Sequence, residues 1–172
     1  MDLTSNWIIW QNHNDESNIK SWGEDLVNVG IFHTVPEFLY LNDEINKVGL
    51  PSLESIRIFK EGIKPMWEDP LNMNGGRVIL DIPIMNRIDV GDVWTKTMAF
   101  CVSNLVDGIC GCVFMEKQNL YKLAIWIEED DLNQEIMKKW KETLELPLDM
   151  FYYLTHKRSI DGVKHKKKWH KK

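Results

Sequence analysis

The stretch from Phe59 to Arg77 has residue types suited to binding a flat, polar ring. It reads FKEGIKPMWEDPLNMNGGR and places Trp67 directly before two acids, Glu68 and Asp69, among Pro and Gly residues that favour turns. A Trp face attracts cationic rings, and a neighbouring carboxylate can accept two hydrogen bonds from adjacent N–H donors on a ring edge. Guanine has such donors at N1 and N2, and methylation at N7 makes it cationic. For an isolated Trp-Glu-Asp triplet, the alternative is an ordinary surface turn.

The whole stretch resembles the cap-binding loop of the translation initiation factor 4E family, which holds the 7-methylguanosine cap of messenger RNA. The MWED run at 66–69 and the GGR run at 75–77 carry the resemblance, which extends from Asn6 to about His156. It implies a curved antiparallel sheet with three helices on its convex face and the cap bound on its concave face. It also implies a non-catalytic role in translation initiation.

The resemblance implies which residues bind the cap base. Trp22 and Trp67 correspond to the two tryptophans that sandwich the methylated base, and two desolvated cation–π contacts supply about 4 kcal/mol. Glu68 corresponds to the carboxylate that accepts from guanine N1 and N2. Trp126 matches the tryptophan that lies against the N7-methyl group. For Trp126 taken alone, a place in the hydrophobic core is the alternative interpretation.

Three basic residues are expected to bind the cap phosphates: Arg77, Lys117 and Lys122. Arg77 matches the Arg of the family's Gly-Gly-Arg motif. Where the family usually has an Arg followed two residues later by a Lys, this chain has Lys117 and Asn119, and Lys122 takes the place of a further family Lys. Lys cannot form a bidentate fork and Asn is uncharged, so we expect weaker phosphate binding.

The resemblance further implies a partner surface on the convex face. The scaffold factor 4G and the 4E-binding proteins dock a short helical motif there, on a Val and a Trp near the first helix and a Trp-Leu-Glu group on the second. This chain has Val35 and Trp94, but Leu39 replaces the first Trp, and Thr95 and Lys96 replace Leu-Glu. Because the last change reverses a charge, we expect an altered partner, or cap binding without the usual scaffold.

The elements that position these residues alternate between strands and one-sided helices. Strands are predicted at 7–10, 55–60, 78–84, 110–116, 122–127 and 150–155, with a polar loop at 11–21 before Trp22. Helices are predicted from the Thr34–Glu37 capping box to Gly49, from Asp89, and from Asp130 or Asp131. This pattern predicts an α+β fold, with helices packed on one face of an antiparallel sheet.

Composition bounds the class of protein. The 172 residues, 44% apolar and 27% charged, predict one soluble domain at 1–156 and a basic tail at 157–172. No run approaches the ~18 apolar residues of a membrane span, and no secretory signal follows Met1, so a cytoplasmic monomer without membrane contact is expected. Cys101, Cys110 and Cys112 lack metal-ligand spacing and are predicted to be buried thiols, and no cofactor is expected.

The tail has eight Lys or Arg against Asp161, a local charge of +7 that leaves −12 on residues 1–156. It either attracts phosphate backbones or acidic partners, or is a solvated extension. Two other functions stay open: an interaction module or translational repressor of the same fold, and a single-stranded RNA binder that stacks bases on its tryptophans. The motifs of phosphate loops, zinc proteases and nucleophile elbows are absent, so an enzyme is not predicted.

Overall fold

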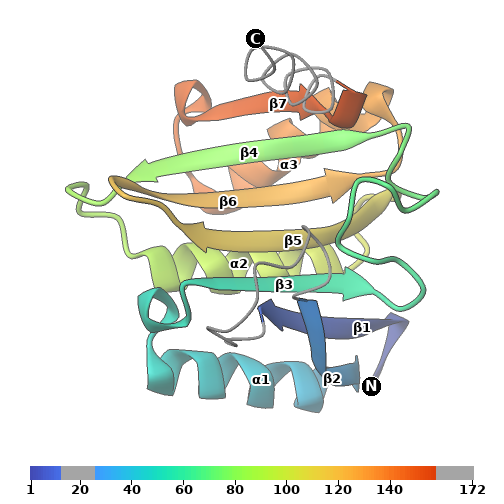
Figure 1. Cartoon of the computed structure of the whole chain (residues 1–172). Helices are drawn as coiled ribbons and strands as arrows, with labels where there is room; N and C mark the ends of the chain where they lie inside the picture. The colour runs from blue at the N-terminus through green and yellow to red at the C-terminus, as the bar shows by residue number, and fades with distance from the viewer. Residues whose placement is uncertain (13–25, 158–172) are drawn as a thin grey trace, which may run out of the picture.

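The computed structural model describes residues 1–12 and 26–157, whose strands form one sheet. Neighbouring strands are antiparallel, in the order β2-β1-β3-β5-β6-β4-β7. The strands are β1 (Asp2–Asn12), β2 (Leu26–Thr34), β3 (Ser55–Lys60), β4 (Gly76–Pro83), β5 (Ile109–Glu116), β6 (Leu120–Ile127) and β7 (Phe151–Thr155). The α-helices of the described part are α1 (Val35–Val48), α2 (Val90–Val102) and α3 (Asn133–Leu144) (Figure 1).

Helices α2 and α3 lie behind the curved sheet in Figure 1, and α1 lies beside β2. This arrangement confirms the predicted α+β fold, an antiparallel sheet with three helices on its convex side. The opposite face of the sheet, called the open face below, is turned toward the viewer. Within the described ranges, no helix combines the length and apolar character needed to cross a membrane.

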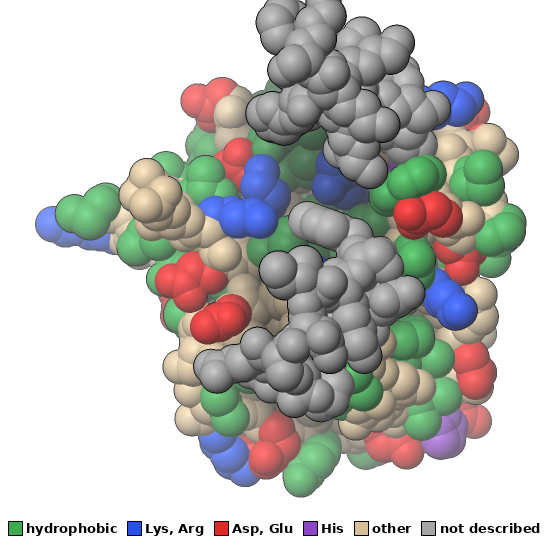
Figure 2. Space-filling model, viewed as in Figure 1, with side chains coloured by type: hydrophobic (Ala, Val, Ile, Leu, Met, Phe, Trp, Pro, Cys, Tyr) green, Lys and Arg blue, Asp and Glu red, His purple; other side chains and the backbone are tan. Residues whose placement is uncertain are grey.

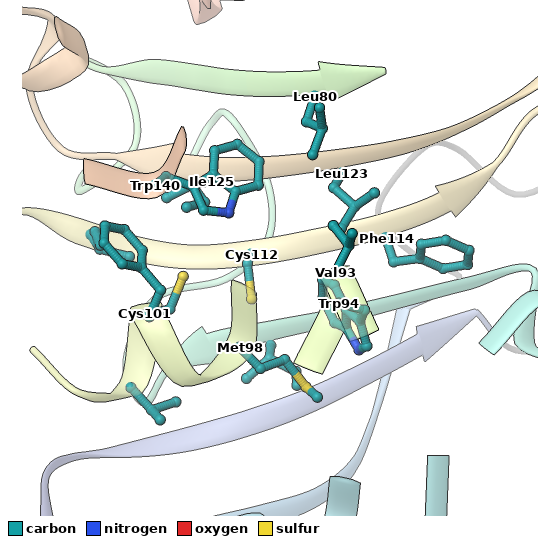
Figure 3. Close-up of a cluster of buried hydrophobic side chains, with 14 of the residues drawn as sticks. Leu80, Val93, Trp94, Met98, Cys101, Cys112, Phe114, Leu123, Ile125 and Trp140 are labelled. Carbon is teal, nitrogen blue, oxygen red and sulfur yellow. The ribbon is translucent and has the colours of Figure 1, made fainter. Parts of the chain in front are cut away.

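The main hydrophobic core lies between the sheet and helices α2 and α3. Trp140 of α3 is fully buried, and its indole Nε1 donates to the hydroxyl of Thr97, 3.0 Å away on α2. That hydroxyl in turn donates to the Val93 carbonyl oxygen at 2.7 Å, so the polar groups of Trp140 and Thr97 are both paired inside the core. Figure 3 shows the side chains that meet there, among them Leu80, Met98, Cys101, Cys112, Phe114, Leu123 and Ile125.

Two predicted helix starts are confirmed. The Thr34 hydroxyl accepts a hydrogen bond from the Glu37 amide at 3.3 Å, and the Glu37 carboxylate accepts one from the Thr34 amide at 3.1 Å. Asp89 caps α2 by accepting from the amides of Gly91 and Asp92. The third α-helix begins slightly later than the predicted start at Asp130 or Asp131, because a 3-10 turn at Asp130–Leu132 precedes α3. The three cysteines are buried and free, as predicted.

β2 was not predicted from the sequence, and β1 is longer than the strand predicted at 7–10. In β2 only Phe32 is buried, while Val27, Val29 and Ile31 are exposed, because β2 is an edge strand. The alternating apolar residues were the signal that could have identified it. β1 extends beyond the predicted 7–10 on both sides, since its polar ends pair with β2 through the backbone and need no apolar side chains.

Candidate functional site

The open face has its own small apolar floor, separate from the main core. Because side chains alternate along a strand, Arg77 and Asp81 of β4 lie on the open face while Val78 and Leu80 point into the core. Figure 2 shows Lys and Arg side chains gathered over β4 and β6 on this face, beside acidic ones. The floor consists of Phe59, Ile63, Cys110 and Val113, with Trp10, Met115 and Trp126 packed against it.

The connection between β3 and β4, which carries Trp67, is held in shape by its own hydrogen bonds. The Asp69 carboxylate accepts from the backbone amides of Lys64 and Leu71 at 2.9 and 3.0 Å. The side chain of Asn72 is fully buried and donates to the carbonyl oxygens of Lys64 and Met66 at 2.9 and 2.8 Å. These hydrogen bonds brace the loop from within.

The two acids of this loop have different environments. Asp69 is used inside the loop, whereas Glu68 is exposed and accepts no hydrogen bond from any residue that the structure describes. Trp67 beside it is 40% exposed, which is unusual for so large an apolar side chain. The loop thus presents one indole and one unengaged carboxylate to solvent, the pair of groups that would suit a flat ring with adjacent N–H donors.

The Gly75-Gly76 pair allows the backbone at the end of this loop to pack tightly against strands β6 and β7. A Cβ on Gly75 would lie 1.7 Å from the carbonyl oxygen of Ile127 on β6, and one on Gly76 would lie 2.3 Å from the carbonyl oxygen of Leu154 on β7. Only glycine fits such close backbone approaches. The pair therefore fixes where β4 begins and places Arg77 directly opposite Trp126 on β6.

Trp126 lies partly buried on the floor of the open face. Its ring meets Phe59 edge to face, with centroids 5.3 Å apart, and the His156 ring at a centroid distance of 4.5 Å. The structure thus places Trp126 in an apolar cluster on the same face as Arg77, and its contact with a methyl group stays a prediction from the sequence.

His156 is 1% exposed and was not recognised from the sequence. Burial, together with the nearby charge of Arg77, lowers its pKa to about 4, although Asp130 opposes the shift. The imidazole is therefore neutral at pH 7 and packs against Trp126 as an uncharged ring. The sequence signal was weak, because a lone His at the end of a strand is usually a surface residue.

We expect acid to destabilise the fold through His156. The unfolded chain takes up a proton near pH 6.5, whereas the folded chain does so only near pH 4, so the contribution of this residue is lost as pH falls between these values. It should amount to about 3 kcal/mol of unfolding free energy. Urea denaturation of the wild type and of His156→Phe across this range measures it. The exposed His33→Gln is the control, and equal pH slopes in wild type and His156→Phe would contradict the expectation.

The three residues expected to bind the cap phosphates differ in their exposure and in the contacts they already make. Lys117 is exposed beyond the end of β5, and its backbone amide donates to the Leu120 carbonyl oxygen at 2.9 Å. Arg77 is half-buried on the open face, where burial lowers its pKa and Tyr152 partly offsets that effect. Lys122 is already engaged, since its ammonium lies 2.9 Å from a carboxylate oxygen of Asp81 and donates to the Tyr152 hydroxyl at 2.7 Å.

The expected partner residues divide between the surface and the core. Leu39 is 58% exposed on α1 and Val35 is partly exposed at its start. Trp94 is fully buried, with its ring 6.1 Å from that of Phe114, so the structure places it in the core and not on the surface that the resemblance implied. The reason is the helical spacing of α2, which turns Trp94 and Met98 toward the sheet.

Several expectations concern residues outside those that the structure describes. Trp22 and the basic tail from Arg158 onward belong to this group, so the second stacking tryptophan and the tail stay predictions from the sequence. Among the described residues, sequence reasoning also missed Asn72, Asp81 and Tyr152. Their roles depend on partners that only the folded chain brings together.

Comparisons with known proteins give one consistent result. Residues 2–171 match the family described as eukaryotic initiation factor 4E. Translation initiation factor 4E-3 of Caenorhabditis elegans is 32% identical over 170 residues, which cover 91% of this chain and 67% of that protein.

The solved structures similar to this chain include initiation factor 4E proteins from two nematodes. Ascaris suum eIF4E-3 with an m2,2,7G cap is similar with a TM-score of 0.80 and 29% identity, over 90% of this chain and 91% of that one. C. elegans eIF4E-3 with the 4E-binding protein Mextli and a cap analogue is similar with a TM-score of 0.80 and 30% identity, over 93% and 95% of the two chains.

Proposed function

Because the chain belongs to the eukaryotic initiation factor 4E family, we propose that it binds the 7-methylguanosine cap of messenger RNA and acts in translation initiation in the cytoplasm. Members of this family are cap-binding factors and not enzymes. Two similar proteins from Ascaris suum and C. elegans have been solved with a cap or a cap analogue. The proposal assigns the same ligand class to the open face of this chain.

The β3–β4 connection is the observation that carries this proposal. It is braced from within by Asp69 and Asn72 and presents Trp67 and Glu68 to solvent. Glu68 would accept hydrogen bonds from N1 and N2 of guanine, and the indole of Trp67 would stack on the methylated ring. Because the loop is already ordered by its own contacts, little conformational entropy would be lost when the base binds.

The charge of the methylated base decides which ligands this site prefers. A Trp face and an anionic carboxylate both interact more strongly with a cationic ring than with a neutral one. Trp22, which lies outside the described residues, would supply the second stacking face. Trp126 would lie beneath the N7-methyl group, with His156 behind it as a neutral support.

Phosphate binding would rest mainly on Arg77 and Lys117. Arg77 lies opposite Trp126 and so next to the position proposed for the base, while Lys117 follows β5 and is exposed. Each charge-assisted hydrogen bond to phosphate contributes about 1.5–3 kcal/mol. Lys122 can add to this only with the donor capacity that Asp81 and Tyr152 leave to it.

The helix side of the sheet would bind a protein partner. Structures of similar proteins include a C. elegans complex with the 4E-binding protein Mextli and a schistosome complex with a 4E-binding protein. Here Val35 and Leu39 would form the apolar contact on α1. Lys96 on α2 is paired with Asp92 at 2.8 Å, so a partner would meet a salt-bridged Lys where the family has Glu. This difference favours a partner with an altered motif.

Methyl dependence tests the proposed function. Intrinsic tryptophan fluorescence is measured while 7-methyl-GTP or unmethylated GTP is added to the wild-type protein. We expect 7-methyl-GTP to quench the fluorescence and to bind at least about a hundredfold more tightly, because the cation–π contacts need the charged base. Equal responses to both nucleotides would indicate a general stacking site, and no response would favour an interaction module without cap binding.

A further inference from the structure

We propose that Asp81 determines how strongly the cap site responds to the number of phosphates on its ligand, because it holds Lys122 in a charge-neutral clamp with Tyr152. The clamp consists of these three residues, Asp81, Lys122 and Tyr152. The inference rests on the proposed function, since it concerns the phosphate end of the same site.

The three side chains of the clamp are joined by two hydrogen bonds and one ion pair. The Lys122 ammonium donates to the Tyr152 hydroxyl at 2.7 Å and lies 2.9 Å from one oxygen of Asp81. The Tyr152 hydroxyl donates to the other oxygen of Asp81 at 3.0 Å. The ammonium thus donates one hydrogen bond, to Tyr152, and is held to Asp81 by an ion pair.

The clamp is a product of sheet geometry. Asp81 and Lys122 are directly opposite each other on the antiparallel strands β4 and β6, and Tyr152 comes from β7 on the other side of β4. All three lie on the open face, because their strand neighbours Leu80, Leu123 and Phe151 are buried in the main core. The side chains of Lys122 and Asp81 are 25% and 29% exposed, so solvent only partly screens their interaction.

The ammonium stays charged in this setting. Burial by itself lowers the pKa of Lys122, but the hydrogen bonds to Tyr152 and Asp81 outweigh burial and raise the pKa above its ordinary value. The positive charge is therefore present, yet the Asp81 carboxylate next to it cancels its field at a distance. A ligand phosphate would meet Lys122 as half of an ion pair and not as an isolated cation.

This arrangement makes a specific prediction about ligands that differ only at the phosphate end. Arg77, which lies opposite Trp126, would bind the phosphate nearest the base in any case. Additional phosphates would gain little from Lys122 while Asp81 holds it. The affinity of the wild type should therefore rise only modestly from 7-methyl-GMP to 7-methyl-GTP, and removal of the Asp81 charge should make the rise steeper.

The test compares 7-methyl-GMP and 7-methyl-GTP by fluorescence titration of the full chain. In Asp81→Asn, which keeps the shape of the side chain, we expect the ratio of the two affinities to increase about tenfold, because the released Lys122 ammonium can donate a charge-assisted hydrogen bond to the additional phosphates. Asp81→Thr, a β-branched residue suited to a strand, is the second variant. Asp92→Asn removes the same charge from the opposite side of the protein and should leave the ratio unchanged.

A double variant separates the clamp from a general field effect. In the Lys122→Gln background, Asp81→Asn should increase the ratio much less, because there is no ammonium to release and only the direct repulsion between Asp81 and the phosphates is removed. A gain of the same size in both backgrounds would overturn the clamp, as would an unchanged ratio in both Asp81 variants. If the wild type binds neither nucleotide, the proposed function itself fails; if it binds both and the Asp81 variants change nothing, only this inference fails.

Discussion

Replacing Glu68 with alanine is expected to weaken binding of 7-methyl-GTP by at least about a hundredfold, with little change in the free energy of unfolding. Glu68 is exposed on a loop whose conformation is maintained by Asp69 and Asn72, so its removal costs no internal contact of the described protein. Two charge-assisted hydrogen bonds to guanine would be lost, each worth about 1.5–3 kcal/mol. Fluorescence titration measures the affinity and urea denaturation the stability.

The matched control for this variant is Glu61→Ala. Glu61 is an exposed acid at the start of the same connection, and its carboxylate accepts a hydrogen bond from Asn6 at 2.9 Å, away from Trp67. The Glu61→Ala variant removes the same charge as Glu68→Ala and should change the affinity for 7-methyl-GTP by less than about threefold. If Glu61→Ala weakens binding as much as Glu68→Ala does, the effect is one of overall charge, and the assigned role of Glu68 is incorrect.

Replacing Gly75 with alanine is expected to lower the free energy of unfolding by about 3 kcal/mol or more. The added Cβ would lie 1.7 Å from the Ile127 carbonyl oxygen, and its next two neighbours are also backbone atoms of Ile127 and Glu128. Backbone atoms cannot rotate away as a side chain does, so β4 would have to move off β6. Chemical denaturation followed by tryptophan fluorescence measures the loss.

The same displacement should reach the ligand site. The carbonyl oxygen of Gly75 accepts from the His156 amide at 3.1 Å, and the Gly75 amide donates to the Asn72 carbonyl oxygen at 3.1 Å. Movement of Gly75 would disturb both the braced loop and the support behind Trp126, and cap binding should fall with stability. Asn74→Ala, at the exposed neighbouring position, is the control. A Gly75→Ala protein as stable as Asn74→Ala would show that the close approach is relaxed in solution.

Much of the fold was predictable because its signals are local. The capping box at Thr34 and Glu37, the Asp89 cap, and the spacing of Ile136, Trp140 and Leu144 each lie within one helix. The strand at Ser55–Lys60 was predicted with its observed bounds. β2 was missed although Val27, Val29 and Ile31 alternate along it; as an edge strand it buries only Phe32.

The candidate site also has a part that the sequence could predict and a part that it could not. The order of residues in the β3–β4 connection pointed to Trp67 and Glu68, because the turn residues and the acids are neighbours in the chain, and the family resemblance supplied their expected roles. Which acid is engaged inside the loop was not predictable, since it depends on how the backbone of Lys64 and Leu71 folds around Asp69.

By itself, the sequence determined the starts of the first two helices and the residue types of the loop that carries Trp67 and Glu68. Only the tertiary structure decided that Trp94 is buried, that His156 supports Trp126 and that Asp81 neutralises Lys122. The physical reason is that charge cancellation and burial act through space. Tyr152 and Asp81 are 71 residues apart in the chain, and only the pairing of β4 with both β6 and β7 brings them to the same ammonium group.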